Sequence, residues 1–552
     1  MATSFTRSRT AGALAGAAAL TLAVAGCAST DEPSDGDATG TDGATTSSGS
    51  DTILIGTTDK ITTIDPAGSY DNGSFAVMNQ VYPFLLNTPY GSPDVEPDIA
   101  ESAEFVSPSE YQVVLKEGLT FANGNALTAS DVKFTFDRMV GINDVNGPAS
   151  LLYNLDSVDV VDDLTVVFNL KSENDQVFPQ ILSSPAGPIV DEDVFAADAL
   201  TPDQEIVDGQ GFAGQYTIAA YDFNNVIEYT AFDGYQGLLG PAETETVIVN
   251  YYADASNLKL EVQEGQIDVA HRSLSATDIE DLQGSEDVTV HEGPGGEIRY
   301  IVFNFNTQPY GAATAEADPA KALAVRQAVA SLIDRAELSE QVYKGTYTPL
   351  YSYVPDGLTG ATESLKDLYG DGAGGPDAAA AAQLLEDAGV TTPVALNLQY
   401  SDDHYGPSSG DEYALIKSQL EADGLFSVNL QTTEWVQYSK DRSSDVYPAY
   451  QLGWFPDYSD ADNYLTPFFL IENFLANHYE NQEVNDLILE QAVTTDPAER
   501  QAKIEEIQDK VAQDLSTVPY LQGAQVAVAG NDVDGVTLDA SFKFRYGTLT
   551  KG

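Results

Sequence analysis

The fold is decided by the stretch "PDIAESAEFVSPSEYQVVLKEGLTFANGNALTASDVKFTFDRM", residues 97–139. β-Branched and aromatic residues over 111–115 predict a strand. Thr128, followed three positions later by Asp131, fits the capping-box pattern, so we expect a helix that begins just before "VKFTFDRMV". Short strands interleaved with capped helices are typical of an α/β fold.

The same alternation continues along the rest of the chain. Asp318 with Pro319, and Asp496 with Pro497, each supply an N-cap and a proline at the first helical position. Further strands are predicted at residues 52–55, 165–170, 226–229, 246–252, 299–305 and 394–400. The body from about residue 51 to the last residue, 552, is too long for one ordinary core, so we expect at least two α/β lobes with mixed sheets.

The N-terminal residues differ from the body in composition. Arg7 and Arg9 precede a short apolar stretch, and residues 1–27 as a whole fit a signal peptide. This segment ends in "VAGC", which resembles the lipobox of bacterial lipoproteins, with Cys27 as the lipidated residue. Cys27 is the only cysteine, so no disulfide can form within a monomer. Residues 28–51 hold six acids, no bases and almost nothing apolar, which predicts a disordered acidic tether.

The charge of the chain restricts its partners. The net charge is −62, from 86 acidic and 24 basic residues. Binding of nucleic acid needs clustered Lys and Arg, so we expect no nucleic-acid partner. After the first segment, no apolar run approaches the length of a transmembrane helix.

Catalytic and metal-binding patterns are weak. The four histidines are scattered and show no paired metal spacing: His271, His291, His404 and His478. "GPSSG" at 406–410 matches the G-x-S-x-G pattern of hydrolases, but several polar residues and Pro407 separate it from the strand before it. There is no phosphate-binding P-loop. We therefore predict a binding protein without a catalytic residue, metal site or cofactor.

One stretch, "GWFPDYSDADNYLTPFF" at 453–469, combines aromatic residues with carboxylates. Asp457 lies between Trp454 and Tyr458 in sequence. A carboxylate flanked by aromatic rings is partly desolvated, so its bond to a cation strengthens while it still needs a partner. The alternative is that Asp457 caps a turn and Trp454 belongs to the core.

Four stretches resemble, in order along the chain, solute-binding protein family 5, the extracytoplasmic receptors of peptide and nickel ABC importers. They are residues 97–139, "AVRQAVASLIDRAELSEQVYKG" (324–345), "AAAAAQLLEDAGV" (378–390) and 453–469. The resemblance implies an α/β, two-lobed, hinge-closing fold of the type II periplasmic-binding-protein kind. Lobe I would comprise 52–303 and 519–552, with an extra subdomain at about 85–200, and lobe II 304–518. The crossings would be "RYIVFNFN" and "STVPYLQ".

The resemblance also implies a binding site. In peptide-binding members the aspartate three residues after this tryptophan holds the ligand's α-ammonium, which here is Asp457 after Trp454. The preceding strand, with Gln451, Leu452 and Gly453, would pair with the ligand backbone as an added strand. Trp454 and Tyr458 would line side-chain pockets.

Two further segments complete the expected site. His404 and Gln451 occupy positions where an oligopeptide-binding relative carries a histidine and an arginine that reach the ligand carboxylate. Gln451 lacks that charge, so the resemblance leaves the ligand's carboxyl end unexplained. From lobe I, the loop with Tyr70, Asp71 and Asn72 would contact the ligand.

The expected function is capture of short peptides between two lobes and delivery to an ABC permease with its ATPase subunits. The expected form is a monomer at the cell surface, anchored to the outer face of the bacterial cytoplasmic membrane by lipid on Cys27. Two alternatives stay open: the same fold binding oligosaccharides or another small solute, and a surface hydrolase or adhesion module.

Overall fold

The computed structural model describes residues 52–272, 274–401, 404–406 and 408–552. The expected signal peptide (1–27, with Cys27) and acidic tether (28–51) lie outside the described residues. Within the described ranges, no helix combines the length and the apolar character needed to cross a bilayer.

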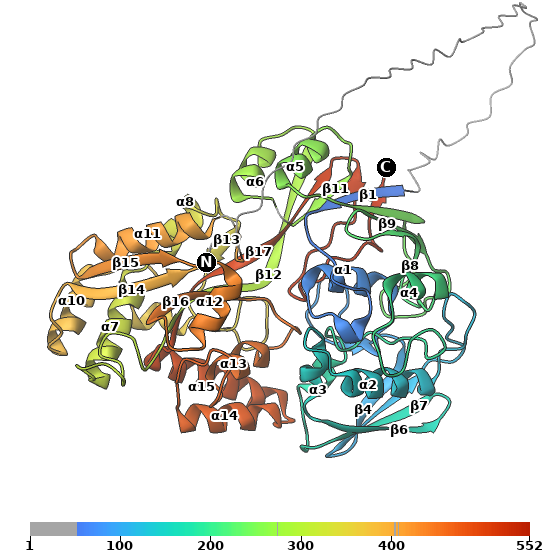
Figure 1. Ribbon diagram of the computed structural model, residues 1–552, viewed down its shortest axis with the longest axis horizontal. Helices are drawn as coiled ribbons and strands as arrows, with labels where there is room; N and C mark the ends of the chain where they lie inside the picture. The colour runs from blue at the N-terminus through green and yellow to red at the C-terminus, as the bar shows by residue number, and fades with distance from the viewer. Residues whose placement is uncertain (1–51, 273, 402–403, 407) are drawn as a thin grey trace, which may run out of the picture. The chain divides into compact units, whose positions relative to one another are not determined.

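One mixed sheet of 11 strands forms the centre of the described chain (Figure 1). Its order is β15 (Phe426–Thr432), β14 (Val394–Tyr400), β16 (Ala449–Trp454), β12 (Val288–Phe303), β17 (Thr517–Gly530), β11 (Val269–His271), β1 (Thr52–Thr57), β10 (Thr246–Tyr251), β9 (Val226–Ala231) and β8 (Tyr216–Asp222). The eleventh strand, β13 (Tyr347–Pro349), pairs with β17. The strands predicted at 165–170 and 394–400 are confirmed at both ends.

A separate sheet of four strands has the order β4 (Ala100–Ser107), β5 (Glu110–Leu115), β7 (Thr165–Leu170) and β6 (Leu155–Asp162). Helix α2 (Ala129–Ile142) packs against β6 and β7. Two short pairs complete the described strands: β2 (Leu86–Asn87) with β3 (Glu96–Pro97), and β18 (Val533–Asp534) with β19 (Thr550–Lys551).

The helices begin where the sequence predicts caps. The capping box of Thr128 and Asp131 starts α2, Asp318 caps α7 (Pro319–Leu332) and Asp496 caps α15 (Pro497–Asp514). The other α-helices are α1 (Asn72–Val81), α3 (Phe178–Ile181), α4 (Asp203–Gly209), α5 (Ala255–Gln263), α6 (Ala276–Gln283), α8 (Arg335–Gln341), α9 (Ser364–Leu368), α10 (Ala378–Asp387), α11 (Ser409–Glu421), α12 (Trp435–Arg442), α13 (Asp462–Phe469) and α14 (Gln482–Ala492). Two short 3₁₀ helices cover Pro66–Gly68 and Pro148–Leu152.

The long strands β12 and β17 lie side by side in the middle of the 11-stranded sheet and extend into both of its halves (Figure 1). Their pairing extends from Val288 opposite Gly530 to Val302 opposite Thr517, with a break between Pro294 and Ile298. Beyond the break, from Ile298 on, β12 also pairs with β16, whereas the other end of β17 pairs with β11. The two strands therefore form a continuous ribbon between the two halves of the sheet.

The strand predicted at 299–305 is too short, because β12 begins at Val288. The residues before Ile298 include "GPGG", which is typical of a turn. Pairing with β17 holds residues 288–294 extended, and it resumes at Ile298 after the break that contains Gly295 and Gly296.

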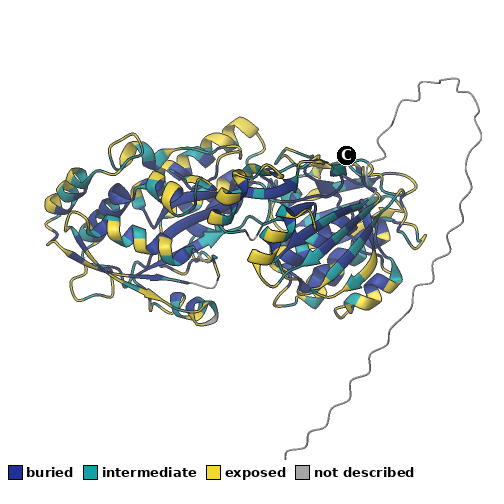
Figure 2. Ribbon diagram, turned by 90° about the horizontal axis from the view of Figure 1, so that it is seen from above, coloured by how far each residue is buried: buried dark blue, intermediate teal, exposed yellow. Residues whose placement is uncertain are grey.

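Buried side chains gather in separate cores (Figure 2). The largest joins residues 298–303 and 518–521 with helices and strands from 325–515. A second core lies around the four-stranded sheet, between residues 85 and 213, and a third contains β1, β8, β9 and β10. The described chain thus forms two α/β lobes joined by β12 and β17. The boundaries expected at 303/304 and 518/519 stay predictions.

Many of the basic side chains are buried in spite of the acidic surplus. Arg138 forms a buried bidentate pair with Asp65, at 2.8 and 2.6 Å. The other buried basic residues in the described chain are Arg299, Arg326, Arg335, Arg442, Lys543 and Arg545. A larger fraction of the bases than of the acids is therefore buried, and the surface is more acidic than the composition alone indicates.

Candidate ligand-binding site

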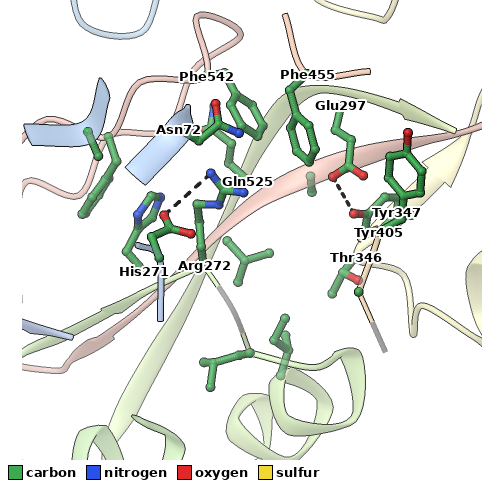
Figure 3. A pocket seen from close by; sticks show the side chains of 18 of the residues that line it. Asn72, His271, Arg272, Glu297, Thr346, Tyr347, Tyr405, Phe455, Gln525 and Phe542 are labelled. Carbon is green, nitrogen blue, oxygen red and sulfur yellow. Dashed lines mark hydrogen bonds and ion pairs between the residues drawn. The ribbon is translucent and has the colours of Figure 1, made fainter. Parts of the chain in front are cut away.

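A pocket of about 330 Å³ lies beside the β12–β17 ribbon (Figure 3). Helices α1 and α6 and the residues around β11 contribute lining from lobe I, and the residues around β13 and after β14 and β16 contribute lining from lobe II. The segment 542–546, after β17, closes a further side. Both lobes therefore form its walls, as expected of a ligand site in a hinged protein.

The lining is rich in aromatic rings. They are Phe75, Tyr343, Tyr347, Tyr405, Phe455, Phe542, Phe544 and Tyr546. His271 stacks on Phe544 with ring centroids 4.1 Å apart, and burial lowers the pKa of His271 to about 3, so this ring is neutral near pH 7. The pocket offers flat apolar faces to a ligand.

One wall is fixed by a hydrogen-bonded network around Arg299, which is almost completely buried. Its Nε donates to Glu297 Oε1 at 2.7 Å, and its Nη2 donates to the carbonyl oxygen of Tyr405 at 2.7 Å. Tyr347 donates its hydroxyl proton to Glu297 Oε2 at 2.6 Å. These contacts hold the lining residues Glu297, Tyr347 and Tyr405 in place. The charges of Arg299 and Glu297 compensate each other.

Asp457 follows β16 and has neutral hydrogen-bond partners. The hydroxyl of Tyr70 donates to Asp457 Oδ1, and Asn463 Nδ2 donates to Asp457 Oδ2 at 3.1 Å. Burial raises the pKa of the Asp457 carboxyl. Within the described residues, no Lys or Arg forms an ion pair with it. A desolvated carboxylate of this kind gains most from an added cation.

The aromatic neighbours of Asp457 pack partly into the protein. Trp454 Nε1 donates to Asn463 Oδ1 at 3.0 Å, and its ring packs edge-on against Phe468. Tyr458 donates to Asp462 Oδ2 at 3.1 Å and packs against the core around the four-stranded sheet. Asn463 thus links Trp454 and Asp457 and sets the position of the carboxylate.

Of the ten residues that the sequence singles out for ligand binding, Asn72 and His404 line the pocket itself. Tyr70 joins lobe I to Asp457. Phe455, two residues before Asp457, is in the lining, whereas Asp457, Trp454 and Tyr458 are not. The predicted carboxylate therefore lies next to the pocket and outside its walls.

The four other residues, Gln451, Leu452, Gly453 and Asp71, do not line the pocket. Gln451 is fully buried, accepts from the backbone N–H of Ser401 at 3.1 Å and donates to Ser409 Oγ at 3.3 Å. Leu452 is a core residue, and the side chain of Asp71 caps α1 by accepting from the Ser74 N–H at 2.8 Å. In this conformation the side chains of these residues offer no polar group to a ligand.

Gly453 has a close neighbour across the strand edge. A Cβ placed on it would lie 2.9 Å from the ring of Tyr405. Ala449 and Tyr450 of β16 pair with β12 on one side and with Leu398 and Gln399 of β14 on the other. Among the described strands, residues 451–454 of β16 pair with β12 alone. The open edge that a ligand backbone could use is therefore short.

Several lining residues had no signal in the sequence. Glu297 precedes the predicted strand, and Arg299, its first residue, has a pattern typical of the core. Arg272 and Phe542 come together only because β11 and the segment after β17 are neighbours in the fold. The sequence offers one indication of Arg272 and Arg299: basic residues are rare in the body, so each of them is a candidate for a specific role.

The chain matches known proteins over most of its length. The family model described as "Bacterial extracellular solute-binding proteins, family 5 Middle" matches residues 94–474. The probable D,D-dipeptide-binding periplasmic protein DdpA of Escherichia coli (strain K12) is 24% identical over 520 residues, which is 91% of this chain and 94% of that protein.

Solved structures share the fold. HbpA2 from Haemophilus parasuis superposes with a TM-score of 0.76 at 20% identity, covering 91% of this chain and 100% of the other. The DppA protein from Helicobacter pylori, in complex with the peptide STSA, superposes with a TM-score of 0.71 at 18% identity, covering 91% and 98%. The family match spans more than half of the sequence, and the neighbours share its two-lobed, type II periplasmic-binding-protein fold. The chain therefore belongs to the bacterial extracellular solute-binding proteins of family 5.

Proposed function

We propose that this protein captures short peptides between its two lobes and delivers them to an ABC permease, with Asp457 binding the ligand's α-ammonium. The observation that carries the proposal is the state of Asp457. Its carboxylate is partly desolvated, has a raised pKa, and is held by the neutral donors Tyr70 and Asn463 beside a pocket formed by both lobes. One charge-assisted hydrogen bond to an ammonium stabilises a complex by roughly 1.5–3 kcal/mol.

The names of related proteins support this ligand class. The relative from Escherichia coli is named as a binder of D,D-dipeptides, and the Helicobacter pylori neighbour was solved with a peptide. The relatives are named as binding proteins, and a receptor that only captures and releases its ligand needs no catalytic group.

A sugar ligand is the second candidate, because eight phenylalanine and tyrosine rings line the pocket among the described residues. Aromatic faces are also suited to sugar rings, and Asp457 would then accept from hydroxyl groups. A hydrolase is less well supported. Ser408, the serine of "GPSSG", lines the pocket, but no hydrogen bond joins it to a histidine in the described part of the chain.

Native mass spectrometry of the full-length protein, purified without denaturation, tests the ligand class. We expect co-purified or added short peptides to remain bound after buffer exchange. Exclusive retention of oligosaccharides from a mixture of peptides and sugars would reject the peptide proposal and favour the sugar alternative.

The location is the second part of the proposal. Family 5 proteins are extracytoplasmic; we propose in addition that Cys27, at the end of "VAGC", carries a lipid that holds a monomeric receptor at the outer face of the membrane. Cys27→Ser should release the protein from membranes or leave its precursor uncleaved. Mature mutant protein that still sediments with membranes would contradict the anchor.

A further inference from the structure

Among the described residues that line the pocket, three are lysine or arginine, and two of these are already engaged. Arg299 is occupied by Glu297 and the Tyr405 carbonyl. Lys543 Nζ is buried and donates to Asn87 Oδ1 at 3.0 Å and to the Ser183 carbonyl at 2.9 Å. The third, Arg272, is the one of these three whose side chain makes no hydrogen bond within the described residues.

Arg272 directly follows β11 and lies beside two aromatic rings that contact each other, those of Phe455 and Phe542 (Figure 3). Its guanidinium carbon is 5.6 Å from the ring centroid of Phe455 and 5.5 Å from that of Phe542. Its nearest carboxylate is Asp59, with Nη1 and Oδ2 3.7 Å apart, which is too long for a hydrogen bond. In the described part of the chain, the side chain of Arg272 has this ion pair and no hydrogen bond.

The backbone at Arg272 supports a functional placement. Its φ is 60°, in the left-handed region that non-glycine residues seldom adopt. Such conformations persist where the surrounding structure holds them, and they concentrate at ligand sites. Here the conformation places a large cation at the pocket wall, where its side chain is 28% exposed.

The ring contacts leave the hydrogen-bonding edge of the guanidinium available. Cation–π contacts use the electron-rich faces of Phe455 and Phe542, whereas the N–H groups of arginine point outward in the guanidinium plane. That planar fork matches the two oxygens of a carboxylate. Asp59 restrains the orientation of Arg272 without satisfying its donors.

We propose that Arg272 binds a carboxylate of the peptide ligand. This inference rests on the proposed function and supplies the partner for the ligand's acidic end, which Gln451 cannot provide because it is buried and hydrogen-bonded inside lobe II. Phe455 contacts Arg272 and precedes Asp457 by two residues, at most about 7 Å of chain. An ammonium anchor at Asp457 and a carboxylate anchor at Arg272 would together select zwitterionic short peptides.

Two sources of carboxylate are possible, the C-terminus and an acidic side chain. Randomised pools of dipeptides to pentapeptides without Asp or Glu, made as free acids and as C-terminal amides, separate them. A third pool contains amides that carry Asp or Glu. Each pool is offered to the full-length protein, and retained peptides are quantified by native mass spectrometry.

With the wild-type protein we expect free acids, or amides with acidic side chains, to be retained at least about tenfold better than amides without a carboxylate. The enriched pool identifies the source. Arg272→Gln should abolish the preference, and Arg272→Lys should restore part of it, because a point charge lacks the fork. Lys133→Gln, which removes the same charge from a residue paired with Asp137 on the exposed face of α2, is the control and should keep the preference.

Three other outcomes reject the inference in distinguishable ways. If the wild type retains all peptide pools equally, peptides bind without a carboxylate anchor and the proposed function stands. If the preference survives in Arg272→Gln, the anchor is another residue. If no pool is retained, the peptide function itself is wrong. The wild-type comparison does not depend on the folding of any variant.

Discussion

At Asp457, two neutral donors share one carboxylate, and a ligand ammonium would add the missing positive charge. We expect Asp457→Asn to weaken peptide binding by about 2–5 kcal/mol, because removing one partner of a desolvated ion pair leaves the other unsatisfied. An N-acetylated peptide should bind the wild type poorly and lose little more with Asp457→Asn, since both changes delete one interaction. Calorimetry on the four combinations measures this coupling.

Asp137→Asn is the control for charge, because Asp137 pairs with Lys133 on the exposed face of α2. It should change binding by less than about 1 kcal/mol. Additive losses from acetylation and Asp457→Asn would place Asp457 outside the ammonium site. Equal binding of free and acetylated peptides would instead favour the sugar alternative.

Asp462, five residues further on, links this region to pH. Burial, and then the carboxylate of Asp460, raise the pKa of Asp462 to about 6. Between about pH 4 and pH 6 the folded protein keeps a proton that the unfolded chain has lost. The free energy of unfolding therefore falls as pH rises through this window, by up to about 3 kcal/mol.

Asp462→Asn should remove this loss. An asparagine oxygen can still accept from Thr466 and Gln491, and its amide can donate to the hydroxyl oxygen of Tyr458. We expect the variant to be more stable than the wild type at about pH 8 and similar at about pH 4. Urea unfolding at both pH values tests this, and a stability difference independent of pH would contradict it.

The β12–β17 ribbon is the element that connects the lobes, and Gly295 of β12 lies close to the backbone of β17. A Cβ on Gly295 would lie 2.0 Å from the carbonyl oxygen of Gly523 on β17. Gly295→Ala should force the strands apart and lower the free energy of unfolding by about 1–3 kcal/mol or more. Denaturant unfolding measures it, with Gly141→Ala in α2 as the control, because no atom lies within 4 Å of a Cβ there. Equal stability of both variants would mean that the ribbon is not tightly packed at Gly295.

Elements with a strong local pattern could be predicted from the sequence. The predictions for β7 and β14 are confirmed at both ends, and the caps at Thr128, Asp318 and Asp496 each start a helix. The sequence does not predict the start of β12, because residues 288–294 are held extended by pairing with β17, more than two hundred residues away, and no local pattern contains that pairing.

The site could be predicted only in part, because some of its residues lie in motifs that resemble the family and others come together only through long-range contacts. Asn72 and His404, which the resemblance predicts as ligand contacts, line the pocket, whereas Asp457, predicted as the ammonium anchor, lies outside its walls. Their roles in ligand binding stay predictions. The sequence could not show that the side-chain amide of Gln451 is hydrogen-bonded to Ser401 and Ser409, because the partner of a polar residue depends on the fold. The pairing of Arg272 with two distant phenylalanines likewise depends on long-range contacts.

At the scale of the whole molecule, two lobes joined by two strands predict a hinge. The lobes already touch through Tyr70 and Asp457, and through the N–H of Gln176 and the carbonyl of Ala492 at 2.8 Å. A ligand that adds contacts to both walls should favour the closed arrangement. Small-angle scattering should therefore give a smaller radius of gyration with saturating peptide than without. An unchanged profile would argue for a rigid groove.

The burial of basic side chains has a consequence for the kinetics of encounter. The net charge is −62 and the surface is richer still in acids, so an approaching ligand meets a negative field before it reaches Arg272. Added salt shortens the range of that field, from about 30 Å at 0.01 M to about 8 Å at 0.15 M. The association rate of an acidic peptide should therefore rise with salt while that of a basic peptide falls, as stopped-flow fluorescence can measure; identical salt slopes would contradict this. Discrimination between peptides then begins during diffusion, before either lobe is touched.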